Sequence, residues 1–185
     1  MTKAQLTVLA GPTAVGKGTV VAALTKRYPA LKVSVSATTR DPRPGELNGV
    51  HYYFVSPQEF DAMIERGDML EWALVHGKNK YGTPRGPVDE ALNAGNPVLL
   101  EIDLAGARQV RANRPDVQFI FLAPPSWEEL QRRLIGRGTE GPEEQARRLA
   151  TARVELEAAS EFDHVVINDD VERAVDELAR LIGLE

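Results

Sequence analysis

Gly16 and Lys17 follow the first apolar run of the chain, and Gly11 opens the same loop. Residues 6–10 have the pattern of a short strand, and the apolar residues from Val20 onward continue as a helix. A strand, a glycine-framed loop and a helix form a P-loop, in which backbone N–H groups at the helix N-terminus bind nucleotide phosphates and the lysine adds a point charge. The segment therefore predicts a site for the phosphates of a nucleotide. Its expected binding residues are Gly11, Pro12, Thr13, Ala14, Val15, Gly16, Lys17, Gly18 and Thr19.

The residue after the lysine departs from the usual pattern, which has a serine or threonine there to contact Mg²⁺. Here that position is Gly18, and Thr19 comes one place later. Asp103 ends an apolar strand, where P-loop enzymes place a carboxylate that helps to hold Mg²⁺. We therefore expect Mg²⁺ as a cofactor with ATP, held by Asp103 through water, with Thr19 as a weaker candidate ligand. The alternative for Asp103 is to cap the helix that follows it.

Four polar side chains suit a second phosphate group. Arg40 and Arg43 flank a proline in a loop that is neither regular helix nor central strand, and Tyr52 and Tyr81 lie on strands that border the same region. Arginines bind phosphate in a bidentate way and phenol hydroxyls donate to it. The set predicts a site for the phosphate of a nucleoside monophosphate, although each residue alone is equally typical of a solvated loop.

Two carboxylates stand in apolar strands, Glu71 in LEWA and Glu101 in LLEID. Guanine presents N1–H and N2–H₂ as donors, so a buried carboxylate accepts from guanine and disfavours adenine. Hydroxyls from Ser36 and Thr83 are candidates for the O6 atom of guanine. The alternative is that both glutamates face outward on half-exposed strands.

Composition limits the possible classes of protein. A chain of 185 residues forms one globular unit with a substantial core, and its net charge of −5 argues against a general nucleic-acid-binding surface. The sequence has no cysteine, no signal-peptide pattern and no apolar stretch that would span a bilayer. We therefore expect a cytoplasmic protein with neither nucleic acid nor membrane as a partner; monomer and homodimer both stay open.

The remaining sequence alternates between strand and helix patterns, which predicts an α/β fold with a parallel sheet covered on both faces. Aromatic strands and a short helix between residues 50 and 83 interrupt this alternation and indicate a small mixed insertion. Ser126 is the expected N-cap of a later helix. The expected strands span 6–10, 32–36, 50–55, 69–77, 79–83, 97–103, 117–122 and 164–167, and the expected helices 57–67, 84–95, 104–113, 127–135, 142–160 and 171–182.

The order and spacing of these segments resemble bacterial guanylate kinases along nearly the whole chain. The resemblance is carried by LTVLAGPTAVGKGT, SVSATTRDPRPGE, NGVHYYFV, LEWA, YGTPR, LLEIDLAGARQV, FLAPPSWEEL, RRLIGRGTE and VVINDD. It implies phosphoryl transfer from ATP to GMP with Mg²⁺, on a P-loop three-layer core with a GMP-binding insertion and a helical lid. The implied division is core at 1–34, 87–125 and 161–185, insertion at 35–86, and lid with flanking helices at 126–160.

The resemblance also assigns roles to single residues. Lys17 matches the phosphate lysine of the family, and Arg133, Arg137 and Arg148 match lid arginines that approach the transferring group, although glutamates nearby offer them ion pairs. Asn168 falls beside the adenine ring. Glu101 departs from the aspartate that is frequent at its position. The GMP-binding positions are Ser36, Arg40, Arg43, Tyr52, Glu71, Tyr81, Thr83 and Glu101.

Three other functions compete with this interpretation. A kinase for another monophosphate is disfavoured by Glu71. A non-catalytic interaction module of the same family typically lacks the phosphate-binding loop that is present here. A GTPase switch would need guanine-binding motifs that this sequence does not show.

Overall fold

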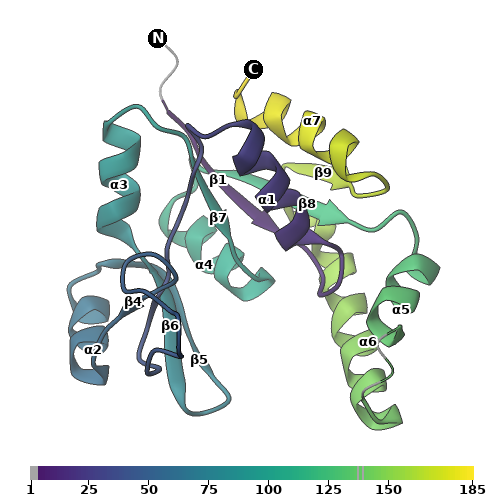
Figure 1. Ribbon diagram of the computed structural model, residues 1–185, viewed down its shortest axis with the longest axis horizontal. Coiled ribbons are helices and arrows are strands. Elements are labelled where there is room, and N and C mark those ends of the chain that lie inside the picture. Colours follow the sequence, from purple (N-terminus) through teal and green to yellow (C-terminus); the bar gives the residue numbers. More distant parts are fainter. Residues whose placement is uncertain (1–3, 137, 139) are drawn as a thin grey trace.

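Two β-sheets organise the computed structural model, which describes residues 4–136, 138 and 140–185 (Figure 1). The larger sheet has five strands, and every neighbouring pair in it is parallel. Parallel neighbours need crossover connections, which the helices between them provide. In spatial order the strands are β2 (Lys32–Val33), β7 (Val98–Glu101), β1 (Leu6–Ala10), β8 (Gln118–Ala123) and β9 (His164–Ile167).

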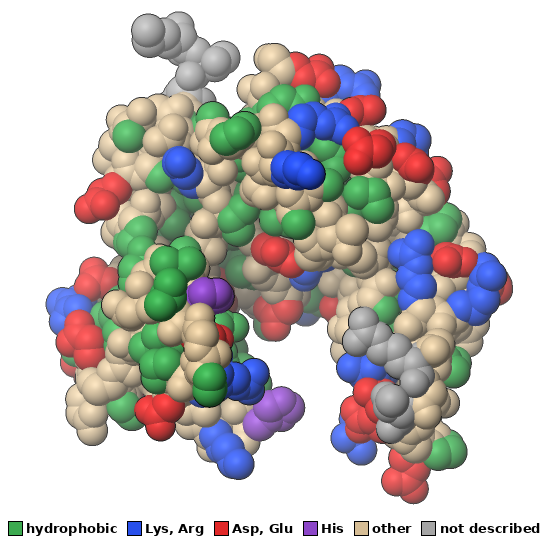
Figure 2. Space-filling view, viewed as in Figure 1, with side chains coloured by type: hydrophobic (Ala, Val, Ile, Leu, Met, Phe, Trp, Pro, Cys, Tyr) green, Lys and Arg blue, Asp and Glu red, His purple; other side chains and the backbone are tan. Residues whose placement is uncertain are grey.

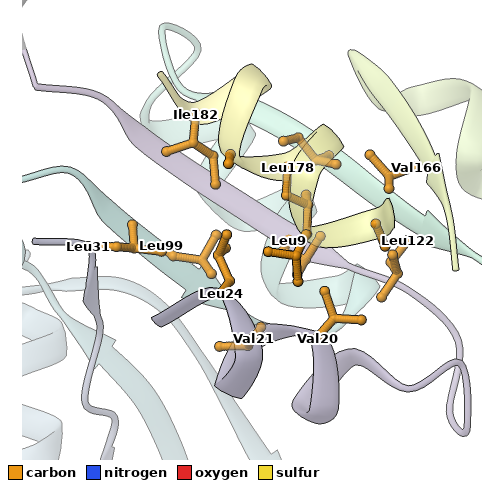
Figure 3. Close-up of a cluster of buried hydrophobic side chains, with 14 of the residues drawn as sticks. Leu9, Val20, Val21, Leu24, Leu31, Leu99, Leu122, Val166, Leu178 and Ile182 are labelled. Atoms are coloured by element: carbon orange, nitrogen blue, oxygen red, sulfur yellow. The ribbon is translucent and has the colours of Figure 1, made fainter. Parts of the chain in front are cut away.

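Helices cover both faces of this sheet, and the alternation along β1 shows why both faces are apolar. Leu9 packs into the cluster formed with α1 (Lys17–Arg27) and α7 (Val171–Ile182), which Figure 3 shows. Its neighbour Val8 packs into the opposite cluster, with α3 (Arg85–Asn93) and α4 (Leu104–Asn113). The three-layer parallel core expected from the sequence is confirmed.

The second sheet is mixed and has four strands, in the order β4 (Tyr53–Phe54), β3 (Ala37–Thr38), β6 (Asn79–Pro84) and β5 (Met69–Val75). The β3–β4 pair is parallel, whereas β6 runs antiparallel to both β3 and β5. Helix α2 (Pro57–Glu65) packs on this sheet through Phe60, which is fully buried. We call β3, β4, α2, β5 and β6 the sheet arm.

Helices α5 (Trp127–Ile135) and α6 (Pro142–Glu157) form a second projection, the helical arm. Ser126 caps α5 as predicted, because its hydroxyl accepts a hydrogen bond from the N–H of Glu129 at 3.1 Å. The two helices pack through a small apolar cluster that also includes Ala14 of the P-loop. The two arms lie on opposite sides of the P-loop end of the core (Figure 1), and Figure 2 shows the molecule hollowed between them.

Several expected elements are shorter than the sequence pattern indicates, and three of them have a visible cause or replacement. The strand expected over 32–36 ends at Val33, because the chain leaves the core sheet there to enter β3. The strand expected over 50–55 is reduced to Tyr53–Phe54, because Val50 and His51 belong to a turn in which their N–H groups donate to the carbonyl of Leu47 at 3.2 and 3.1 Å. The last long helix ends at Glu157, and a 3₁₀ turn, η1 (Ala158–Glu161), replaces its final residues. In the part of the chain that the structure describes, no helix has both the length and the apolar character needed to cross a bilayer.

Candidate active site

The P-loop connects β1 to α1, and its shape depends on Gly16. This residue adopts a left-handed conformation with φ of 93°, which disfavours side chains, and it immediately precedes α1. The first turn of α1 has no acidic residue to compensate the positive end of the helix dipole. The helix N-terminus is therefore available to an anion, as the sequence predicts.

A cavity of about 320 Å³ lies over this loop. Its walls are formed by most of the loop and by Lys17, together with the carboxylates of Glu101, Asp103 and Glu155. The ammonium of Lys17 donates to the carbonyl of Ile102 at 3.3 Å. Burial lowers the pKa of Lys17, and the nearby carboxylates oppose that shift, Glu101 most strongly. The cavity thus presents a cation over a helix N-terminus, within a ring of negative charge.

Asp103 caps the helix that follows it and also faces the P-loop cavity, so its position suits both of the roles that the sequence left as alternatives. Its Oδ1 atom caps α4 by accepting the N–H of Gly106 at 2.8 Å, while the residue itself is exposed and lines the cavity. Capping uses one carboxylate oxygen and leaves the other available to a water-bound cation. The two interpretations of Asp103 are therefore compatible.

The carbonyl of Val15, inside the P-loop, receives two side-chain donors. Asn168, which is 4% exposed, donates from Nδ2 at 2.8 Å, and Arg133 donates from Nη1 at 3.1 Å. Asn168 also lies so close that a side chain at Gly16 would meet its Nδ2 atom at 2.7 Å. Both residues, expected at the adenine ring and at the transferring group respectively, support the phosphate-binding loop directly in this structure.

Of the other two arginines expected in the lid, Arg148 and Arg137, the structure describes only Arg148. Arg148 on α6 pairs with Glu140, with Nη1 of the arginine 2.9 Å from Oε1 of the glutamate. Arg137 lies outside the described residues. Arg148 therefore has a partner within the helical arm, as the ion-pair alternative anticipates.

The predicted monophosphate site is assembled around Arg40 in the sheet arm. The guanidinium of Arg40 lies 5.3 Å from the centre of the Tyr52 ring, and Tyr52 contacts Tyr81 edge-on at a ring-centre distance of 5.9 Å. Glu46 binds the guanidinium through both carboxylate oxygens, at 2.9 and 3.0 Å. Arg40, Tyr52 and Tyr81 thus lie together, and the carboxylate of Glu46 fixes the guanidinium of Arg40.

Glu46 is a residue that sequence reasoning missed. It also accepts the backbone N–H of Arg43 at 2.7 Å, while Arg43 itself is exposed. The hydrogen bonds from Arg40 and then from the Arg43 backbone lower the pKa of Glu46 to about 2. Its only signal in the sequence is a carboxylate shortly after two arginines in a proline-rich loop.

Glu71 and Thr83 form the buried part of the predicted guanine site. The two residues are paired across β5 and β6, and the Thr83 hydroxyl donates to Oε1 of Glu71 at 2.7 Å. Glu71 is only 9% exposed. Burial raises the pKa of its carboxyl group, the Thr83 hydrogen bond opposes that shift, and the charge of Asp103 adds to it.

Ser36 and Glu101, also expected at the guanine end, have different positions. Ser36 directly precedes β3, and its carbonyl accepts the N–H of Tyr53 at 2.9 Å. Glu101 ends β7, is exposed and lines the cavity with Lys17. The structure thus brings Glu101 to the P-loop cavity, and the carboxylate whose charge acts on Glu71 is that of Asp103.

Glu155 on α6 is the second residue that sequence reasoning missed. Burial raises the pKa of its carboxyl group, and the charge of Lys17 opposes the shift. The helix around it is rich in glutamates, so its sequence carries no signal that separates it from solvent-facing neighbours. It brings the helical arm into contact with the P-loop cavity.

Comparison with known proteins agrees with this architecture. A family model described as guanylate kinase matches residues 3–185. The chain is 61% identical over 177 residues to the guanylate kinase of Leifsonia xyli subsp. xyli, covering 96% of this chain and 70% of that protein. It is 61% identical over 179 residues to the guanylate kinase of Thermobifida fusca, covering 97% and 91%. The crystal structure of guanylate kinase from Anaplasma phagocytophilum superposes with a TM-score of 0.72 at 33% identity, covering 97% of this chain and 85% of that one. The chain belongs to the guanylate kinase family.

Proposed function

We propose that this chain transfers the γ-phosphoryl group of ATP to GMP, giving ADP and GDP. The observation that carries the proposal is the pairing of Glu71 with Thr83, because a buried carboxylate is the group that a guanine base requires and an adenine base does not. The sheet arm carries this pair. The hollow between the two arms (Figure 2) separates the sheet arm from the helical arm, which packs against Ala14 of the P-loop. The proposed substrates therefore approach from two sides of one space.

The ATP half of the site is the P-loop with Lys17. Backbone N–H groups of the loop and of the start of α1 bind the phosphates. Lys17 neutralises charge on oxygens of the β- and γ-phosphates. Asn168 keeps the loop in shape through Val15 and marks the side where the adenine would lie.

The GMP half of the site is the sheet arm. In this proposal Glu71 accepts from N1–H and N2–H₂ of guanine, and Thr83 fixes the carboxylate by donating its single hydroxyl hydrogen to it. Arg40 and the two tyrosines bind the 5′-phosphate. Arg43 joins them, and Ser36 and Glu101 complete the guanine end.

The reaction needs no covalent protein intermediate and no side-chain base. The phosphate dianion of GMP is already a nucleophile, so catalysis consists of in-line positioning and stabilisation of charge on the transferring group. Closure of the two arms would exclude water, which otherwise hydrolyses ATP. In the proposal, residues 35–86 act as the GMP-binding insertion and residues 126–160 as the lid, and Arg133, Arg137 and Arg148 contact the transferring group on closure.

Mg²⁺ is the proposed cofactor with ATP. Asp103 offers a carboxylate oxygen at the edge of the P-loop cavity, and oxygen donors are what Mg²⁺ prefers. Among the described residues no three His, Cys, Asp or Glu side chains form a ready cage for a metal ion. This donor set fits an ion that keeps most of its water and binds mainly to substrate phosphates. Its chemical contribution is to neutralise charge on the phosphate oxygens.

Gly18→Ser is expected to be tolerated and to lower the Mg²⁺ concentration needed for half-maximal activity by about two- to tenfold. A side chain at Gly18 would meet nothing within 4 Å, and a serine hydroxyl there adds the ligand that the motif usually supplies. The measurement is a Mg²⁺ titration of activity at saturating ATP and GMP. If Thr19→Ala raises the Mg²⁺ requirement sharply and Gly18→Ser has no effect, Thr19 is the direct ligand and this account is wrong.

A coupled ADP-release assay with a panel of monophosphates tests the proposed function. GMP, dGMP, AMP and UMP are compared at equal concentration, with ATP and Mg²⁺ held constant. We expect activity with GMP, weaker or equal activity with dGMP, and little with AMP or UMP. A preference for AMP, or the absence of ADP release with every monophosphate, would sink the assignment. A cytoplasmic location fits these substrates, and the proposal includes neither nucleic acid nor membrane as a partner.

A further inference from the structure

Strand β5, which carries Glu71, has β6 on one side only, and its other edge faces helix α4. The side chain of Gln109 on α4 occupies that edge. Its Oε1 atom accepts the backbone N–H of Trp72 at 3.0 Å, and its Nε2 atom donates to the carbonyl of Trp72 at 2.9 Å. One glutamine amide therefore makes the pair of hydrogen bonds that a neighbouring strand would make with Trp72.

The contact extends along one face of α4. Asn113 donates to the carbonyl of Leu70 at 3.3 Å. Leu70 lies two residues before Trp72, so its backbone carbonyl is on the same free edge of β5. Gly106, Gln109 and Asn113 follow the three- and four-residue spacing of one helix face. Strand β5 is thus bound to α4 over about two helical turns.

Gly106 brings the same helix against Glu71 itself. A side chain at Gly106 would lie 3.1 Å from Oε2 of Glu71 and 3.1 Å from Oδ1 of Asp103. The backbone of α4 therefore forms the wall of the space that the Glu71 carboxylate occupies. Asp103 caps the N-terminus of this helix. The same helix therefore contacts both carboxylates, Asp103 on the side of the proposed Mg²⁺ and Glu71 on the side of the proposed guanine.

We infer that Gln109 is a positioning residue for the monophosphate base, and that Gly106 sets the space in which the Glu71 carboxylate can orient. The inference rests on the proposed function, because it assigns the guanine contact to Glu71. Trp72 follows Glu71 directly. Fixing the N–H and the carbonyl of Trp72 therefore also fixes the direction in which the side chain of Glu71 projects from β5. Neither residue touches the base, and both act through Glu71.

Gln109→Leu tests the inference because it removes both hydrogen bonds at nearly constant volume. We expect the KM for GMP to rise about tenfold with an unchanged KM for ATP. The preference for GMP over inosine monophosphate, which lacks the 2-amino group, should fall as well. Hydrogen exchange at the Trp72 amide should become faster. Arg108→Ala is the matched control, since Arg108 neighbours Gln109 on α4 and pairs with Glu161 away from β5.

Gly106→Ala is a second variant that keeps both Gln109 hydrogen bonds. Alanine favours a helix more than glycine, so a general loss of helical structure is not expected. The added methyl group displaces Oε2 of Glu71, and the KM for GMP and the preference over inosine monophosphate should change as for Gln109→Leu. The inference is overturned if both variants keep the wild-type KM and preference, or if the KM for ATP rises in parallel in Gln109→Leu, which leaves Asp103 untouched. A wild-type protein that does not phosphorylate GMP contradicts the proposed function instead, so the two failures are distinguishable.

Discussion

Lys17→Ala is expected to lower kcat by about 10³-fold, with a change in GMP affinity of no more than a few-fold. The Lys17 ammonium lies at the P-loop cavity, whereas the Glu71–Thr83 pair lies in the sheet arm. Its loss removes a charge that acts on the transferring group more strongly than on bound ATP, so the effect falls mainly on kcat. Steady-state kinetics with both substrates varied, together with calorimetric titration of GMP, measure the two effects separately.

Lys26→Ala is the matched control for this experiment. Lys26 lies in the last turn of the same helix, α1, and is exposed. Its removal is expected to leave kcat within twofold of wild type. Turnover by Lys17→Ala within tenfold of wild type would refute the role of Lys17 in phosphoryl transfer.

Glu71→Gln is expected to raise the KM for GMP by about 10²-fold or more and to narrow the preference for GMP over AMP. The substitution keeps an oxygen that accepts the Thr83 hydroxyl, but it places an amide N–H₂ where guanine presents its own donors. The comparison of kcat/KM for GMP and AMP measures this effect. Glu65→Gln, at an exposed position on α2, is the control.

The same substitution is expected to stabilise the protein at neutral pH, raising Tm by about 2–4 °C. Burial raises the pKa of Glu71 above its ordinary value of 4.5, so in the range above 4.5 the folded protein binds this proton more tightly than the unfolded chain does. Stability therefore falls as pH rises through that range, and the neutral glutamine avoids the loss. Thermal melts of both proteins at pH 4 and pH 7 measure it, and the gain should shrink at the lower pH.

The pH dependence of GMP binding provides a further check on Glu71. Because the carboxylate accepts from guanine only when it is ionised, the affinity for GMP should fall as pH decreases through the raised pKa. The inflection that belongs to Glu71 should lie above 4.5 in wild type and be absent in Glu71→Gln, whereas the fall caused by protonation of the GMP phosphate, whose second pKa is about 6, should remain in both proteins. A wild-type preference for GMP that survives in the variant would show that another group recognises the base.

Several features of the candidate site could be predicted because they depend on residues that are close together in the sequence. The P-loop needs only neighbouring residues, and Ser126 and Asp103 act on backbone groups three residues away, so spacing alone identifies them. The three-layer core follows from apolar runs of strand length separated by helices. These features depend on short stretches of chain.

Two of the residues that sequence reasoning missed, Gln109 and Glu155, act over longer distances or through the folded shape. Gln109 binds Trp72, which is 37 residues away, and nothing in the helix around Gln109 indicates an edge strand nearby. Glu155 reaches the P-loop cavity only because α6 packs beside that loop.

The hydrogen bond from Asn168 to the carbonyl of Val15 joins residues 153 positions apart. The phosphate-binding loop therefore emerges from the ribosome long before its buried partner has been translated. β8 and β9, which complete the sheet beside β1, also come late in the chain. A nascent chain that stops short of Asn168 thus lacks one support of its phosphate site, and full nucleotide binding should develop only after Asn168 has emerged.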